Sequence, residues 1–205
     1  MLKEKLIKPI SGFIMILFLA VLVAATIYLA ANEIFPPQFL IISGVLFFFL
    51  VPGFKIVNPN EAIALIFFGK YVGTIKENGF FWVNPFYISK KLSLRARNLN
   101  GEKLKVNDGV GNPIEIAAVI VWKVSDTFKA LYEVDDYVNF VRIQSEAAIR
   151  VLANKYPYDQ FEDENADLTL LSGAEKVNEE LEKELHDRLE SAGIVSIEAR
   201  IRHLA

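Results

Sequence analysis

Residues 114–124 read IEIAAVIVWKV, and this stretch determines which class of fold the chain can form. Isoleucine, valine and tryptophan favour extended backbone, and successive residues of a strand point to opposite sides. One side is entirely apolar and consists of Ile114, Ile116, Ala118, Ile120, Trp122 and Val124. The other side is apolar in its middle, which predicts a central strand that is covered on both sides.

Shorter strands are expected before this one. Residues 61–68, EAIALIFF, form an apolar run that ends at Gly69, which is typical of a buried strand. In KKLSLRARN, Leu92, Leu94 and Ala96 alternate with polar residues, which predicts a strand with one solvated face. The pair Asp108-Gly109 indicates a turn before the central strand.

After the central strand, the apolar residues recur at the spacing of a helix. Asp126 is a good N-cap for a short helix, and Asp135 or Asp136 caps a longer one that extends to about Lys155, before Pro157. The apolar stripe of the longer helix is Tyr137, Val141, Ala148 and Val151/Leu152. On its opposite face, the four-residue spacing of Arg142, Glu146 and Arg150 predicts a ladder of ion pairs.

A last helix and a last strand complete the pattern. The helix has an apolar residue at every fourth position, namely Val177, Leu181, Leu185 and Leu189. Gly193 follows as a terminator, and VSIEARI then predicts a strand. Strands first, helices next and one strand last indicate an α+β domain over residues 55–205.

The first 54 residues have a different composition. Between Pro9 and Phe54 the only charged residue is Glu33, and Pro36 and Pro37 interrupt the apolar sequence. The segment 9–31 exceeds the ~20 residues of a membrane span, whereas a cleavable signal peptide has a shorter apolar run of ~7–15 residues. We therefore predict a basic N-terminus (1–8) and a membrane hairpin (9–54) with helices at 9–31 and 36–54. A buried core helix is the alternative for the second segment, which is short for a full span.

Basic residues predict the orientation of the hairpin. Lys3, Lys5 and Lys8 precede it, Lys55 follows it, and its turn has none. Because basic residues favour the cytoplasmic side, both ends of the hairpin, and the domain after them, are expected there, at the cell (inner) membrane. If the second segment does not return across the bilayer, the domain faces the other compartment.

The sequence lacks the residues and motifs that several classes of protein function require. The chain has no cysteine, and residues 55–205 carry 19 basic and 23 acidic side chains, so disulfides and general nucleic-acid binding are not expected. No metalloprotease, nucleophile-elbow or nucleotide-binding motif occurs. His186 and His203 are isolated, and helix capping and solubility explain the acidic groups Asp135-Asp136 and 162–164. We expect no catalytic residues, cofactor or metal.

Aromatic residues gather in NGFFWVNPFY, residues 78–87, although its turn-forming residues indicate an irregular backbone. Trp and Tyr favour the headgroup zone of a bilayer, and lysines attract anionic lipids. The candidate membrane-contacting residues are Phe80, Phe81, Trp82, Phe86, Tyr87, Lys90 and Lys91. The alternative is a plain core in which Phe80 and Trp82 pack under a sheet.

From about Pro52 to Ala205 the sequence resembles the SPFH or band 7 domain, which occurs in stomatins, prohibitins and flotillins and in regulators of a membrane-bound AAA protease. The resemblance depends on the order of its motifs, namely NPNEA, FGKYxGT, GFFWVNP, RxRNLNGEKLKVND, GNPIEIAAVIVWKV and IQSEAAIR. The hairpin anchor resembles that of stomatin.

The resemblance implies a non-enzymatic scaffold that is anchored in the bilayer, assembles into a homo-oligomeric ring and holds partner membrane proteins. The alternatives are a dedicated regulatory subunit of a membrane-bound protease or transporter and, as a third class, a membrane hydrolase. Family members continue after the domain into a coiled coil that closes the ring, and this chain ends at Ala205. With only the basic region 55–105 and the acidic region 159–190 as complementary faces, we expect weak, salt-sensitive self-association.

Overall fold

The computed structural model describes residues 4–32, 34, 36, 38–159 and 169–205. The chain folds as two compact units, unit 1 (Met1–Ser93) and unit 2 (Leu94–Ala205). Among the described residues, unit 1 has two α-helices and two sheets, and unit 2 has three α-helices and one sheet. The predicted α+β class is confirmed.

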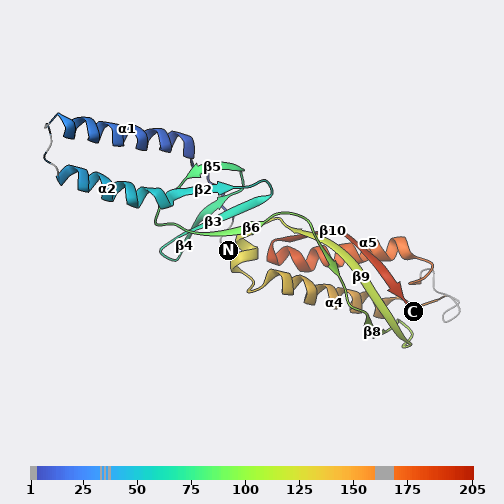
Figure 1. Cartoon of the computed structure of the whole chain (residues 1–205). Helices are drawn as coiled ribbons and strands as arrows, with labels where there is room; N and C mark the ends of the chain where they lie inside the picture. The colour runs from blue at the N-terminus through green and yellow to red at the C-terminus, as the bar shows by residue number, and fades with distance from the viewer. Residues whose placement is uncertain (1–3, 33, 35, 37, 160–168) are drawn as a thin grey trace. The chain divides into compact units, whose positions relative to one another are not determined.

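Unit 1 begins with two apolar helices, α1 (Gly12–Ala31) and α2 (Gln38–Leu50), which run side by side (Figure 1). The 20 residues of α1 span about 30 Å, the thickness of a bilayer's hydrocarbon core. The 13 residues of α2 span only about 20 Å before a 3₁₀ turn, η1 (Val51–Gly53). Helix α1 is long and apolar enough to cross a membrane, and α2 is a shorter apolar helix.

A small antiparallel sheet joins these helices to the rest of unit 1. Its strands in spatial order are β1 (Ile10–Ser11), β5 (Gly79–Trp82) and β2 (Phe54–Val57). Strand β1 leads into α1, and β2 follows η1, so both helices connect directly to this sheet. The irregular backbone expected in the aromatic stretch is therefore wrong for residues 79–82, because pairing on both sides of β5 holds them extended.

The second sheet of unit 1 carries the core. Its strands in spatial order are β4 (Lys70–Ile75), β3 (Glu61–Phe67) and β6 (Ile88–Ser93). The central position of β3 confirms the strand that the apolar run predicts. A buried cluster fills the interior and consists of Val57, Ile63, Leu65, Ile75 and Val83.

The residues before the first helix belong to the folded part of unit 1. The Ile7 amide donates to the Thr74 carbonyl at 3.1 Å, and the Thr74 amide donates to the Lys5 carbonyl at 2.7 Å. The Lys76 amine and the Glu4 carboxylate form an ion pair at 2.7 Å. The segment therefore pairs with β4.

Unit 2 is built on a sheet in which β9 is central. Its strands are β10 (Ile194–Leu204), β9 (Pro113–Val124), β7 (Arg97–Asn100) and β8 (Leu104–Asn107), with β10 on one side of β9 and β7 and β8 on the other. The side of β9 that is apolar throughout is buried, as predicted. The predicted coverage of the second side is only partial within this unit: Ala117 is fully buried there, whereas Val119 and Val121 are half-buried.

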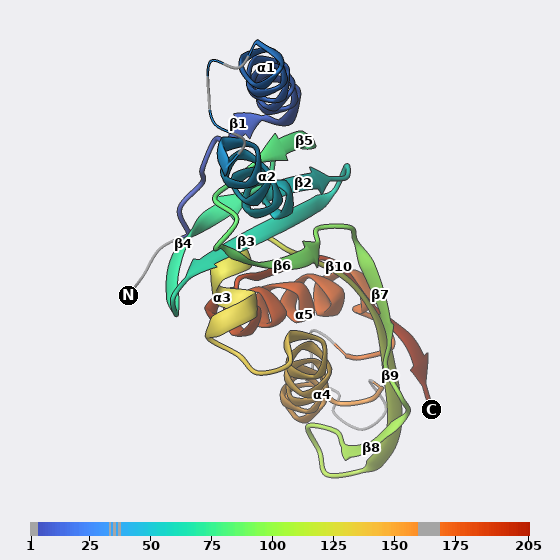
Figure 2. The same cartoon turned by 60° about the vertical axis from the view of Figure 1, so that its left-hand side comes forward.

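Three α-helices lie on one side of this sheet (Figure 2). They are α3 (Thr127–Tyr132), α4 (Tyr137–Lys155) and α5 (Ala174–Leu189). The predicted caps are confirmed: Asp126 accepts from the Lys129 amide at 3.0 Å, and Asp136 accepts from the Val138 amide at 2.9 Å. The predicted stripe of α5, Val177 to Leu189, is fully buried.

Gly193 ends this helical region as predicted. A 3₁₀ turn, η2 (Glu190–Ala192), follows α5, and Gly193 adopts the left-handed conformation at φ +67° before β10. A Cβ atom at this position would lie 2.5 Å from the Asp126 carbonyl oxygen. Glycine is therefore needed for both its backbone angle and its small size.

Two further predictions are wrong in detail. The strand expected through Leu92, Leu94 and Ala96 ends at Ser93, where the two units meet in sequence. The ion-pair ladder on α4 is not formed among the described residues, because Arg142 donates instead to the Asn139 side chain at 2.8 Å. Of the two apolar residues proposed at the end of its stripe, Leu152 is buried and Val151 is exposed.

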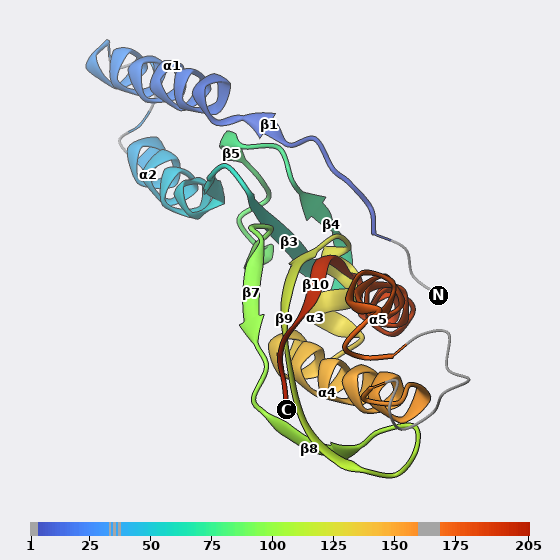
Figure 3. The ribbon, with the colours of Figure 1, turned by 90° about the vertical axis from the view of Figure 1, so that its right-hand side faces the viewer.

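Helices α4 and α5 lie next to each other (Figure 3) and are joined by an ion pair between Lys155 and Glu180 at 2.7 Å. Hydrogen bonding to Glu180 raises the pKa of the Lys155 amine, and the same bond lowers the pKa of the Glu180 carboxyl below its ordinary 4.5. The stabilisation from Glu180 is therefore present above pH 4.5 and is lost as the pH falls through its folded-state pKa. Both side chains are well exposed, so this effect is small.

Candidate membrane-contacting site

The aromatic side chains of β5 point alternately to its two sides, because the strand is extended. Phe80 and Trp82 share one side, and Phe81 points to the other. On the first side, the Phe80 ring stacks on the Phe54 ring with 5.4 Å between centroids. It also meets the Phe13 ring edge-on at 5.3 Å. Phe80 therefore packs against the start of α1 and the start of β2.

Trp82 makes the corresponding contact with α2. Its indole Nε1 donates to the carbonyl of Leu50, the last residue of α2, at 2.9 Å. The final carbonyl groups of a helix lack partners within the helix, so this bond satisfies one of them. Gly53 makes the approach possible, since a Cβ atom there would lie 2.5 Å from the indole nitrogen. Phe80 and Trp82 thus attach the strand to the bases of both helices.

The other predicted residues divide into two groups. Phe81 and Tyr87 pack against the buried cluster of unit 1, whereas the plain-core alternative names Phe80 and Trp82 as the core residues. Phe86, Lys90 and Lys91 are exposed. Because Lys90 and Lys91 are adjacent in β6, their side chains leave opposite faces of the strand.

The structure adds two aromatic residues that the sequence prediction omitted. Phe67 ends β3, and Phe68 follows it in the turn to β4, with ring centroids 4.7 Å apart. Phe68 is 83% exposed and has a φ of +44°, a conformation that bulky side chains rarely adopt. The sequence does carry a signal, because two phenylalanines stand directly before Gly69, a turn-forming residue.

These two residues extend the exposed aromatic surface of unit 1. The Phe67 ring meets the Tyr87 ring at 5.5 Å, and Ile88, which is 62% exposed, follows Tyr87 and pairs with Ile66. We name the set Phe67, Phe68, Phe86 and Ile88 the aromatic tip. A water-facing location would leave these four side chains unburied, at a cost of about 1.5–3 kcal/mol for each large apolar group that could otherwise be fully buried.

Basic side chains accompany the aromatic residues. Lys70 is paired with Phe67 across the β3–β4 hairpin. Lys8 lines a shallow pocket together with Trp82, Asn84 and Tyr87. Amines beside aromatic rings match the chemistry of a bilayer surface, where anionic headgroups lie over hydrocarbon.

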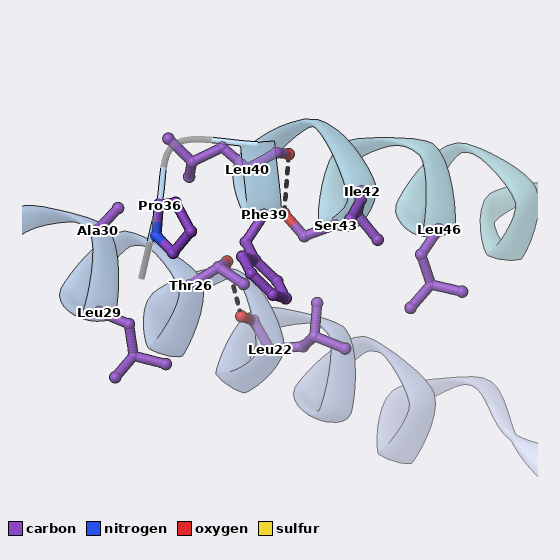
Figure 4. A pocket seen from close by; sticks show the side chains of 10 residues that line it. All are labelled: Leu22, Thr26, Leu29, Ala30, Pro36, Phe39, Leu40, Ile42, Ser43 and Leu46. Carbon is purple, nitrogen blue, oxygen red and sulfur yellow. Dashed lines mark hydrogen bonds between the residues drawn. The ribbon is translucent and has the colours of Figure 1, made fainter. Parts of the chain in front are cut away.

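An apolar groove runs between α1 and α2 (Figure 4). Its lining residues are Leu22, Thr26, Leu29, Ala30, Pro36, Phe39, Leu40, Ile42, Ser43 and Leu46. The Thr26 hydroxyl donates to the Leu22 carbonyl at 2.9 Å, and the Ser43 hydroxyl donates to the Leu40 carbonyl at 3.0 Å. Because each hydroxyl is bonded within its own helix, the groove suits hydrocarbon better than a polar ligand.

The described residues contain no cluster of three or more His, Asp or Glu side chains that could hold a metal ion. His186 is exposed on α5, and His203 lies 4.0 Å from the Glu115 carboxylate. Asp136 caps α4, which is the structural role expected for it. The acidic group 162–164 lies outside the described residues.

Comparison with known proteins supplies two findings. A model of the SPFH domain / Band 7 family matches residues 55–205. A stomatin homolog from Pyrococcus abyssi (strain GE5 / Orsay) is 24% identical over 164 residues, which cover 78% of this chain and 58% of that relative. The chain thus spans less than two thirds of the relative's length.

Proposed function

Because the chain belongs to the SPFH domain / Band 7 family, we propose that it is a membrane-anchored, non-enzymatic scaffold that forms homo-oligomers and holds partner membrane proteins. Membership in this family indicates a membrane-associated role. The observation that best supports the proposal is the attachment of β5 to both helix bases through Phe80 and Trp82. These contacts couple the two helices to the sheets of unit 1, as an anchored scaffold requires.

The aromatic tip and its lysines form the second contact with the bilayer. The side chains of Phe68 and Phe86 are 83% and 60% exposed, and partial insertion of the tip into the bilayer would bury much of this apolar surface. Lys8, Lys70 and Lys90 would then lie among the headgroups, each attracted to anionic lipid by about 1 kcal/mol. Phe81 and Tyr87 support this surface from the core of unit 1.

Labelling of the aromatic tip tests this contact. The chain lacks cysteine, so an environment-sensitive fluorophore can be attached at Phe68→Cys in the full chain reconstituted into bilayers. We expect clearly blue-shifted emission, because the tip lies in an apolar medium. Val110→Cys is the matched control, since Val110 is a 53% exposed apolar residue in a turn of unit 2. Equal, water-like emission from both positions would contradict insertion.

The domain is expected on the cytoplasmic side of the cell membrane. Lys5 and Lys8 precede α1, and Lys55 follows α2, so these lysines lie at the same end of the helical pair. Positive residues favour the cytoplasmic side of a membrane. In intact cells, Ile34→Cys between the helices should react with an impermeant thiol reagent. Lys183→Cys on the exposed side of α5 should react only after permeabilisation. Reaction of Lys183→Cys in intact cells would reverse the assignment.

A dedicated regulatory subunit of a membrane-bound protease or transporter is the alternative function. Purification of the full chain from native membranes separates the two. A scaffold should retain several partners and a distinct lipid composition. One partner in fixed stoichiometry would favour the regulatory subunit, and a hydrolytic activity abolished by changing one polar residue would refute a non-enzymatic role.

A further inference from the structure

The second side of β9 is the first of two apolar surfaces in unit 2 that face outward. Helices α3, α4 and α5 lie on the other side of β9 (Figure 2). On the second side Ala117 is fully buried, and the apolar side chains that reach solvent are Val119 and Val121, which are both half-buried. Their neighbours in the adjoining strands are Asn98, Asn100, Glu198 and Arg200. We name Val119, Val121 and these four neighbours the outer sheet face. A strand that is apolar on both sides is typical of a sheet that is covered on both sides.

The second surface is on α4. Phe140, Ile143, Ala147 and Val151 are spaced by three or four residues and form one stripe along the helix. This outer stripe lies opposite the buried side of α4, and Ile143 and Val151 are 51% and 48% exposed. The sequence prediction did not include this stripe, because it placed Arg142, Glu146 and Arg150 on the outward face of the helix.

The neighbouring helix shows that an outward side in this layer can be fully charged. At equivalent spacing, the outward stripe of α5 consists of Lys176, Glu179, Lys183 and Asp187, all exposed. The apolar stripe of α4 is therefore a particular property of that helix. Apolar residues that recur along one outward helix face are the usual basis of a contact with another protein surface.

Assembly through the outer edge of the sheet is obstructed. The amide of Ala199 in β10 donates to Glu182 at 3.0 Å, and the amide of Ile201 donates to Asn178 at 3.0 Å. Both acceptors are side chains of α5. Since these outward-pointing amides are already occupied, β10 is a poor template for a strand from a neighbouring chain. Contact through the faces of the unit is favoured instead.

We propose that the outer stripe of α4 in one copy packs on the outer sheet face of the next copy. The proposal rests on the oligomeric scaffold proposed above and names the surfaces of its subunit contact. Because the two surfaces lie on opposite sides of unit 2, the contact joins unlike surfaces and repeats head to tail. Such a contact closes into a ring when the rotation between copies is suitable.

Charges at the two ends of these surfaces match in this arrangement. The Gly109 amide donates to the Tyr156 carbonyl at 2.9 Å, so the end of α4 lies beside the start of β9. If copies stack in similar orientation, Arg150 of one copy approaches Glu115 of the next. Asp135, which lies just before α4, then approaches Lys123 at the end of β9. Both ends therefore place opposite charges together.

The size of the contact predicts its strength. With 19 residues, α4 is about 28 Å long and, with side chains, about 10 Å wide. Such a strip is small beside the roughly 800 Å² per partner of a standard interface. Free chains should therefore associate weakly. Anchored chains share one plane, which raises their effective concentration and favours the contact.

Disulfide trapping tests the two surfaces in the full chain, reconstituted into bilayers. A mixture of Ala147→Cys and Val121→Cys chains should form crosslinked dimers on mild oxidation. Chains that carry both changes should form a ladder of larger products. Lys183→Cys mixed with Val121→Cys is the matched control, and we expect at least about tenfold less product. Val119→Cys serves as a second partner position, and circular dichroism checks that each variant is folded.

Each outcome decides the proposal. Crosslinking of Ala147→Cys chains with one another, in place of the mixed product, would mean contact between like surfaces and would overturn it. Absence of product with both Val121→Cys and Val119→Cys would also overturn it. Amine crosslinking of the unchanged chain distinguishes failure of this interface from failure of the oligomeric scaffold. If oligomers form without the mixed disulfide, only this interface is wrong, and if none form, the oligomeric scaffold is wrong.

Discussion

Replacement of Asp108 by alanine should lower the free energy of unfolding of unit 2 by about 3–5 kcal/mol, because loss of its buried carboxylate leaves several amide donors without an acceptor. Asp108 is only 4% exposed. One carboxylate oxygen accepts from the amides of Val110, Gly111 and Asn112, at 2.7–3.0 Å. The other oxygen accepts from the amide of Tyr158, at 3.0 Å. The side chain thus connects the β8–β9 turn to the chain that follows α4.

Each unit contains one tryptophan, which makes the measurement specific. With Trp82→Phe as the background, Trp122 alone reports denaturant unfolding of unit 2. Asp108→Asn should also destabilise the unit, since its amide group would face the Tyr158 amide donor. Asp135→Ala is the control, because Asp135 is exposed and a surface change typically shifts stability by no more than about 0.5 kcal/mol. Equal midpoints for Asp108→Ala and Asp135→Ala would refute the structural role of Asp108.

Gly53→Ala should separate Trp82 from the base of α2 and destabilise unit 1 by about 1–3 kcal/mol, the usual cost of forcing extra atoms into a packed site. The new Cβ atom would lie 2.4 Å from the Val83 carbonyl oxygen and 2.5 Å from the Trp82 indole nitrogen. The backbone cannot move away easily, because the Val83 amide donates to the Gly53 carbonyl at 2.9 Å. The bond from Trp82 to Leu50 is then lost.

Fluorescence of Trp82 in a Trp122→Phe background reports this change. We expect red-shifted emission and a lower unfolding midpoint for Gly53→Ala in detergent. Gly44→Ala is the matched control, because it adds the same methyl group to α2 where no atom lies within 4 Å. It should leave both values unchanged or slightly increase stability. Similar behaviour of the two variants would mean that close packing at Gly53 is unimportant.

Elements with a periodic side-chain pattern could be predicted from the sequence. The stripe Val177 to Leu189 and the uniformly apolar side of β9 gave the correct element, because each buries a regular set of side chains. The caps Asp126 and Asp136 were predictable for a local reason, since a cap depends on residues within one turn.

Main-chain pairing is what the sequence did not reveal. Residues 4–11 pair with β4 and β5 chiefly through backbone groups, which leave no apolar period, so their side chains indicate only a basic and then apolar segment. The alternation across Leu92, Leu94 and Ala96 crosses the boundary between the two units. A side-chain pattern cannot show that the strand partner changes there.

The candidate site was predictable in part for the same reasons. The composition of 78–87 identified the aromatic stretch, but the roles of its members depend on contacts far away in sequence. Trp82 bonds to Leu50, and Phe81 packs in the core. The apolar run 61–68 predicts Phe68 at the end of a strand, whereas it lies in the turn after β3, and the sequence does not show where that turn begins.

Depth-dependent quenching of Trp82 is the most direct test of the central claim, that unit 1 is seated on the bilayer at the bases of its two helices. The Trp122→Phe chain, reconstituted into bilayers, has Trp82 as its sole tryptophan. We predict strong quenching by lipids brominated near the headgroup and weaker quenching by lipids brominated at the chain ends. Absence of quenching by both lipids, in protein that circular dichroism shows to be folded, would contradict the claim and place Trp82 in a plain protein core.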